Sequence, residues 1–302
     1  MTRFTVLTLI ILLLVLPFAG CAGQAAEAGA EDAGQVSTGR AIQNKGSDTL
    51  VNMALAWAEA YREVDPSLSI AVTGGGSGTG IAALINGTVD IANASRAMKP
   101  EEIDQAQANG IDPVEHVVAI DALAIIVNPE NPVDQLTMPQ LAGIYTGRIT
   151  NWSQVGGNDA AIVLLSRESN SGTHVYFLEE VVRGGDPESE DIFAPQTLYM
   201  LSSVGITSEV RRNPNAIGYD GLGYVDEDHE KVLGIAVDAD SPYWKPSVET
   251  AASGKYPIAR PLYMYTAGEP TDAIKEYLDW IRGPEGQKIV AELGFVPITA
   301  GE

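Results

Sequence analysis

Apolar residues follow two alternating patterns along the chain from residue 41 onward. In residues 49–63 they occur at positions 51, 54, 55, 58 and 61, which is the spacing of an amphipathic helix. Shorter apolar runs precede this helix and others like it, as strands do in a parallel sheet. The pattern predicts strands that open at 41 and cover 69–73, 89–92, 162–165 and 261–265, and helices over 49–63, 138–145, 172–182, 272–281 and 284–293, with one more ending at 85 and one more beginning at 100.

The run 114–127 holds two strand-like stretches around Asp121. We interpret the second stretch as a crossing into another domain and the run 261–265 as the return. The sequence thus predicts an α/β protein whose first domain is built from both ends of the chain. Its predicted boundaries are 40–124 plus 262–302 for domain I and 125–261 for domain II.

The amino terminus has the pattern of a signal peptide, predicted over residues 1–20. Arg3 supplies a short positive region, an apolar stretch covers 4–16, and Pro17 ends it before small residues. The apolar stretch is shorter than the roughly 20 residues that a membrane-spanning helix needs. An uncleaved membrane anchor is the alternative, and both readings place the rest of the chain outside the cytoplasm.

Cys21 ends a segment, Phe18-Ala19-Gly20-Cys21, that resembles a bacterial lipobox, although Phe18 stands where leucine is usual. The resemblance implies that Cys21 is lipidated and becomes the new terminus. The following residues, to 39, are almost all small, acidic or polar, so residues 21–39 are predicted to be a lipidated cysteine and a flexible tether.

The charge of the chain excludes several classes of partner. Eighteen Lys and Arg residues against forty Asp and Glu residues give a net charge of −22 and a pI near 4.3. A field of this sign repels nucleic acids and anionic lipid surfaces. Cys21 is the only cysteine and the three histidines lie far apart in sequence, so no disulfide, metal site or cofactor is expected.

Three predicted strand-to-helix junctions carry hydroxyls and glycines: 46–49, 75–80 and 169–173. The first turn of a helix has unpaired N–H groups and a partial positive charge, so such junctions bind anions. Arg167 lies just before the third junction, at the predicted carboxyl end of a strand, where a guanidinium can hold a tetrahedral oxyanion. Together these features predict an oxyanion site.

Nucleotide and hydrolase motifs do not fit the same loops. No lysine follows Gly78 or Gly80 as a Walker loop requires, and Gly-x-Ser-x-Gly is absent around Ser77. Ser171 and His174 are spaced like a nucleophile and base, but the sequence shows no acid to orient the histidine, which is expected to pack or to face solvent. No enzymatic activity is therefore predicted.

The chain resembles the phosphate-binding protein of the high-affinity phosphate ABC transporter. The resemblance covers roughly residues 41–298. Its motifs are GSDTL at 46–50, GGGSGTG at 74–80, NGTVDIANASR at 86–96, IYTGRITNWSQVGG at 144–157, SRESNSGTH at 166–174, AIGYDGLGYV at 216–225, RPLYMY at 260–265 and GPEGQKIVAELGFVPI at 283–298. The resemblance implies a type II periplasmic-binding-protein fold, in which two α/β domains joined by two crossing strands close on one phosphate.

The resemblance also implies which residues bind phosphate. Arg167 would be the charged clamp, and Leu50 would donate through its backbone. The implied set is Ser47, Thr49, Leu50, Ser77, Ser95, Arg167, Ser171, Gly172 and Thr173. Many members carry an aspartate where this chain reads Asn93-Ala94-Ser95-Arg96. That aspartate accepts the proton of monohydrogen phosphate, so Ser95 or Asp48 is the candidate proton acceptor here.

The leading prediction is capture of inorganic phosphate and its delivery to the permease and ATPase subunits of an ABC transporter. The protein would be a monomer, lipid-anchored through Cys21 on the outer face of the cytoplasmic membrane. The alternatives are a receptor for sulfate, molybdate or phosphonate, a secreted phosphate-ester hydrolase using Ser171, and an adhesive lipoprotein. Affinity and anion selectivity do not follow from the sequence.

Overall fold

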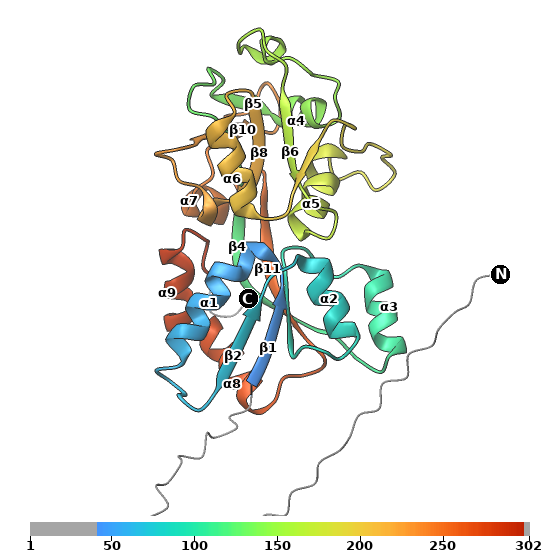
Figure 1. Ribbon diagram of the computed structural model, residues 1–302, viewed down its shortest axis with the longest axis vertical. Coiled ribbons are helices and arrows are strands. Elements are labelled where there is room, and N and C mark those ends of the chain that lie inside the picture. Colours follow the sequence, from blue (N-terminus) through green and yellow to red (C-terminus); the bar gives the residue numbers. More distant parts are fainter. Residues whose placement is uncertain (1–40, 299–302) are drawn as a thin grey trace, which may run out of the picture. The chain divides into compact units, whose positions relative to one another are not determined.

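The strands form one nine-stranded sheet in the computed structural model, which describes residues 41–298 (Figure 1). The sheet follows the order β2 (Ser69–Thr73), β1 (Ala41–Gly46), β3 (Ile91–Ala94), β11 (Ala259–Thr266), β4 (Val114–Val127), β8 (Ala216–Gly221), β6 (Val163–Arg167) and β7 (Leu198–Met200), with β9 (Lys231–Val232) paired to β4. A separate pair joins β10 (Gly234–Ala236) to β5 (Gln135–Thr137). The predicted signal peptide over 1–20, the lipidated Cys21 and the tether over 21–39 lie outside the described residues.

Strands β4 and β11 lie side by side and connect two groups of elements (Figure 1). The two strands pair antiparallel with each other, β11 also pairs antiparallel with β3, and β4 also pairs antiparallel with β8. The pairs further out are parallel, as in β1 with β2 and β6 with β8, whereas the short β9 pairs antiparallel with β4. Arg260 on β11 is the direct cross-strand partner of Asp121 on β4, and both side chains are buried.

The helices pack on this sheet in the two groups. On the side of β1, β2 and β3 they are α1 (Asp48–Tyr61), α2 (Ser77–Ile85), α3 (Pro100–Ala108), α8 (Asp272–Arg282) and α9 (Pro284–Glu292). On the side of β6 and β8 they are α4 (Met138–Tyr145), α5 (Gly172–Phe177), α6 (Ser203–Arg212) and α7 (Val248–Ala252). Short 3-10 turns cover Trp152–Val155 and Leu222–Tyr224, and a π-helical turn covers Leu178–Val182.

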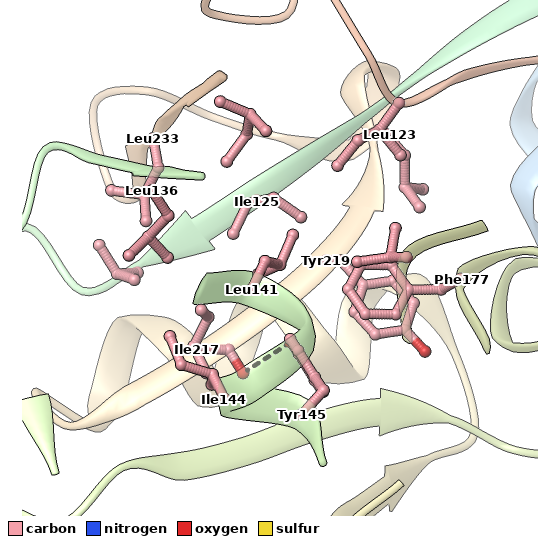
Figure 2. Close-up of a cluster of buried hydrophobic side chains, with 14 of the residues drawn as sticks. Leu123, Ile125, Leu136, Leu141, Ile144, Tyr145, Phe177, Ile217, Tyr219 and Leu233 are labelled. Carbon is pink, nitrogen blue, oxygen red and sulfur yellow. Dashed lines mark hydrogen bonds between the residues drawn. The ribbon is translucent and has the colours of Figure 1, made fainter. Parts of the chain in front are cut away.

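Each group of elements has its own apolar core. One core joins α1, α8 and α9 to the sheet around Trp57, whose indole donates to the Gly286 carbonyl (2.9 Å). The other core, drawn in Figure 2, stacks Phe177 on Tyr219 with ring centroids 3.7 Å apart. Next to it the Tyr145 hydroxyl donates to backbone oxygens of the neighbouring strands β6 and β8. This packing fixes α5 against the sheet and so fixes the loop that precedes it.

The structure confirms many predicted elements and corrects some. The strand at 69–73 and the helix at 138–145 are found as predicted, but the strand predicted at 89–92 is Ile91–Ala94. The two stretches of 114–127 form one strand, because Asp121 is paired with Arg260 and does not interrupt it. The predicted helix over 172–182 is α-helical only to Phe177 and continues as the π-helical turn.

A crossing from one group of elements to the other is found in β4, and the return lies in β11. The domain boundaries at 124/125 and 261/262 stay a prediction. Among the described helices, none has the length and apolar character to cross a membrane.

Candidate functional site

A cluster of buried hydroxyls lies where the first two predicted anion loops meet. Ser47 directly precedes α1, Ser77 begins α2 and Ser95 follows β3. The Ser47 Oγ lies 3.0 Å from Ser95 Oγ, which lies 3.3 Å from Ser77 Oγ. The backbone N–H of Ser95 also donates to Ser77 Oγ (3.0 Å). All three side chains are buried, so their hydroxyls face one another rather than bulk water.

A second hydroxyl contact joins the two groups of elements. Thr49 on α1 and Thr173 on α5 lie with their Oγ1 atoms 3.0 Å apart, and both are buried. Arg260 donates from Nη2 to the same Thr173 Oγ1 at 2.8 Å. The hydroxyls of loops distant in sequence are thus brought together, with a guanidinium in direct contact.

Gly172 closes the cluster from the side of α5. A methyl group on its Cα would overlap Ser77 Oγ and would lie 2.6 Å from Ser95 Oγ. No larger side chain fits this position unless the serines move. Next to it, Ser171 caps α5, accepting from the Thr173 N–H at 3.2 Å. We define the hydroxyl cradle as Ser47, Thr49, Ser77, Ser95, Gly172 and Thr173.

The cradle has the chemistry of an oxyanion site. Helices α1 and α2 begin at the cradle. The N-terminus of a helix presents unpaired N–H groups and a partial positive charge. Hydroxyls can rotate to donate to an anion. The arrangement offers several donors in a region shielded from water, where hydrogen bonds to an anion are stronger than at the surface.

Arg167 lies next to the cradle, and its side chain is held by protein groups. It donates from Nη2 to Asp48 Oδ2 (2.7 Å) and from Nη1 to Ser203 Oγ (3.1 Å). It also donates from Nε to the Met200 carbonyl and from Nη2 to the Leu201 carbonyl. The assignment of Arg167 as the anion clamp stays a prediction.

The structure also locates the remaining residues predicted from the first loop. Asp48 accepts from Arg167 through Oδ2 and from the Gly75 N–H through Oδ1 (3.0 Å). The backbone N–H of Leu50 donates to the Ser47 carbonyl (3.1 Å), and the Leu50 side chain is in the core. The predicted role of Leu50 as a backbone donor, like that of Asp48 as a proton acceptor, stays a prediction.

His174 packs, which is one of the two outcomes that the sequence predicted, the other being exposure to solvent. Its Nδ1 lies 3.1 Å from Ser166 Oγ, and its ring lies against Phe193 with centroids 4.7 Å apart. Burial lowers its pKa. The contacts described for His174 therefore direct it into the core behind α5.

Sequence reasoning missed three buried charged residues near the cradle. Arg260 and Asp121 form an ion pair (3.0 Å) with side chains 2 % and 0 % exposed. Asp220, also fully buried, accepts from Ser203 Oγ (2.8 Å), and Ser203 in turn accepts from Arg167. The available signal was a charged residue among mostly apolar neighbours inside each of three strands, and those strands are neighbours in the sheet.

Burial governs the titration of both carboxyls. It raises the pKa of Asp220 to about 6, and the nearby Arg167 guanidinium opposes that shift. Burial also raises the pKa of Asp121, against the opposing effects of Arg260 and the Leu222 backbone. Charged carboxylates in such positions are stable only beside cations or hydrogen-bond donors.

Comparisons with known proteins show the family to which this chain belongs. Residues 25–285 match the family model of a PBP superfamily domain. The phosphate-binding protein PstS of Bacillus subtilis is 33 % identical over 299 residues, covering 96 % of this chain and 94 % of that protein. The protein of the same name from Pseudomonas aeruginosa is 32 % identical over 276 residues, covering 86 % of this chain and 83 % of its own length.

A solved structure with the same fold carries a ligand. It is a putative phosphate ABC transporter substrate-binding protein from Clostridium perfringens with bound phosphate, and it is 33 % identical. The match covers 86 % of this chain and all of that one, with a TM-score of 0.76. The chain therefore belongs to the PBP superfamily and, within it, to the PstS family of phosphate-binding transport receptors, which is not a family of enzymes.

Proposed function

We propose that this protein binds inorganic phosphate in the hydroxyl cradle outside the cytoplasm and delivers it to an ABC permease. The observation that carries the proposal is the 3.0 Å contact between Thr49 and Thr173, supported by the serine cluster beside it. A tetrahedral oxyanion held here would be bonded from both groups of elements at once. Binding would therefore favour the closed arrangement of the two groups.

The proposed ligands are those predicted from the sequence, with one addition. Hydroxyls of the cradle, together with Ser171, would donate to the phosphate oxygens, and Leu50 and Gly172 would contribute backbone donors. Arg167 would supply positive charge from beside the cradle. We add Arg260, because it already donates to Thr173 and has a second nitrogen, Nη1, without a hydrogen-bond partner within residues 41–298.

The binding requires no covalent chemistry, and we propose that the protein has no catalytic activity. We further propose that the protein acts as a monomer anchored through a lipidated Cys21. Domain I would comprise 40–124 plus 262–302 and domain II 125–261. The continuous path of β4 and β11 between the two groups of elements supports this division.

Equilibrium dialysis of the purified protein against labelled phosphate tests the proposal. We expect one phosphate retained per chain, and unlabelled phosphate should displace it far better than sulfate, molybdate or a phosphonate. Equal displacement by these anions would support the broader oxyanion receptor. Failure of the folded protein to retain phosphate would contradict the proposal and favour the adhesive alternative. Release of phosphate from a generic ester, lost in Ser171→Ala, would instead support the hydrolase.

A further inference from the structure

Arg260 and Asp121 form a pair with one free polar atom on each side. Arg260 Nη2 donates to Asp121 Oδ2 at 3.0 Å, and Arg260 Nε approaches the same oxygen at 3.3 Å. Arg260 Nη1 and Asp121 Oδ1 are both buried and have no hydrogen-bond partner within the described chain. A buried donor or acceptor without a hydrogen-bond partner is destabilising, and more so when the group is charged, so both atoms point to a ligand.

The pair lies against the hydroxyl cradle. Arg260 Nη2 also donates to Thr173 Oγ1 (2.8 Å), which contacts Thr49. Asp121 also packs on Gly221, where an added Cβ would lie 2.9 Å from Asp121 Oδ1. The glycine leaves room for the carboxylate, and the register of β4 with β11 fixes it opposite Arg260.

One free donor beside one free acceptor defines the ligand that satisfies both. Sulfate at neutral pH has only acceptor oxygens, so it can accept from Arg260 but leaves the Asp121 carboxylate unpaired and repelled. Monohydrogen phosphate carries acceptor oxygens and one hydroxyl, so it can satisfy both atoms. Sites built around a buried polar group reject ligands that leave it unpaired by factors of about 10⁴–10⁵.

We propose that the Arg260–Asp121 pair recognises the protonated oxygen of the bound anion: Arg260 Nη1 donates to the anion and Asp121 Oδ1 accepts its hydrogen. Asp121 is then the residue that makes the site select monohydrogen phosphate, or another tetrahedral oxyanion that carries a hydrogen, over fully ionised anions. This proposal rests on the proposed function, because it assigns the specificity of the same site.

Two other carboxylates near the cradle are placed differently. Both oxygens of Asp48 already accept hydrogen bonds, from Gly75 and Arg167. Asp220 has a buried oxygen without a partner in the described residues, but it is linked to Arg167 through Ser203. Asp121 differs from both because its own arginine touches the cradle. Asp220 is therefore the matched control, because it is equally buried and Asp220→Asn removes one negative charge, as Asp121→Asn does.

The test compares phosphate and sulfate binding to the dialysed full chain, purified in detergent, for wild type, Asp121→Asn and Asp220→Asn. We expect Asp121→Asn to lower the phosphate-to-sulfate affinity ratio at least tenfold, because the amide donates to sulfate where the carboxylate repelled it. Asp220→Asn should change both affinities alike and keep the ratio within about threefold of wild type. An unchanged ratio in Asp121→Asn, or a larger change in Asp220→Asn, would overturn the proposal.

The wild-type arm separates this proposal from the proposed function. Wild-type protein that binds neither anion contradicts the proposed function and this proposal together, whereas normal phosphate binding with an unchanged Asp121→Asn ratio contradicts this proposal alone. A crystal structure of the wild type with phosphate gives the same answer if Asp121→Asn does not fold. We expect Asp121 Oδ1 at about 2.5–2.7 Å from a phosphate oxygen. A water molecule between Asp121 and the anion would overturn the assignment.

Discussion

Thr49 and Thr173 lie 124 residues apart in sequence, and their hydroxyl oxygens are 3.0 Å apart in a buried contact between α1 and α5. The contact joins the two groups of elements that β4 and β11 connect. Each threonine comes from a loop that composition alone marks as an anion loop. Their meeting is the strongest sign that these loops form one site.

Thr173→Val should weaken phosphate binding by about 10- to 100-fold. Valine keeps the shape of threonine but removes the Oγ1 atom that contacts Thr49 and Arg260. A hydrogen bond to a charged group contributes about 1.5–3 kcal/mol, which corresponds to this range. Calorimetric titration measures it. Thr207→Val makes the same change at a buried position of α6, where the hydroxyl bonds its own helix, and should leave the affinity unchanged.

Gly172→Ala should impair binding by crowding the cradle. The new methyl would overlap Ser77 Oγ and press on Ser95 Oγ, which must then move away from the anion. Overpacking of this kind costs about 1–3 kcal/mol, so we expect phosphate affinity to fall about tenfold or more. Gly268→Ala is the control, because an added Cβ there meets no atom within 4 Å among the described residues. Equal affinities for these two variants would show that the Ser77 and Ser95 hydroxyls displaced by the methyl group do not hold the anion.

Asp48→Asn should weaken phosphate and sulfate binding by similar factors, about three- to tenfold. The substitution removes the 2.7 Å ion pair that holds Arg167, and Arg167 serves any anion alike. The Asp48 side chain is 21 % exposed, so solvent screens part of the effect. Competition binding measures both affinities. A selective gain in sulfate binding would instead identify Asp48 as the proton acceptor that the sequence suggested.

The stability of the protein should depend on pH through Asp220. Its pKa is about 6 in the folded chain and near 3.8 when unfolded, so the folded state holds the proton more tightly. The stabilisation is complete below pH 3.8 and is lost as pH rises through 6. The loss is about 3 kcal/mol by linkage.

Urea denaturation at pH 4 and pH 7 tests this dependence. The free energy of unfolding of wild type minus that of Asp220→Asn should be smaller at pH 7 than at pH 4. Asp238→Asn is the control, because the Ser241 hydroxyl lowers the pKa of Asp238 and its titration therefore lies below pH 4. The difference in stability between wild type and Asp238→Asn should stay nearly constant from pH 4 to pH 7. A flat difference for Asp220→Asn would mean that this carboxyl is not the buried, proton-holding group described here.

Local patterns were enough to predict the α/β fold, many of its elements and the crossing strand β4. Each of these follows from apolar spacing or a short motif, such as the apolar period that predicts α1. Elements with weaker patterns, such as β7 with its exposed residues Leu198 and Tyr199, were not predicted. The run 114–127 was divided around Asp121 because its partner on β11 is 139 residues away.

The hydroxyls that the structure brings together and the buried Arg167 could be predicted from local motifs, but the buried charges within other strands could not. Ser47, Ser77 and Thr173 belong to loops whose composition indicates anion binding. Arg260 and Asp121 lie inside strands, where a charged residue does not by itself indicate a site. Only the strand register shows that the two residues are paired. Residues whose role depends on strand pairing need the three-dimensional structure.

Titration calorimetry of dialysed protein with phosphate, for wild type and the double variant Ser77→Ala/Ser95→Ala, tests the central claim most directly. The variant removes two cradle hydroxyls without adding bulk, and its circular dichroism should match wild type. We predict one phosphate bound per wild-type chain, with affinity at least a hundredfold lower in the variant, because two donors to a charged ligand are lost. Wild-type protein that binds no phosphate, or a folded variant that binds it as tightly as wild type, would contradict the account.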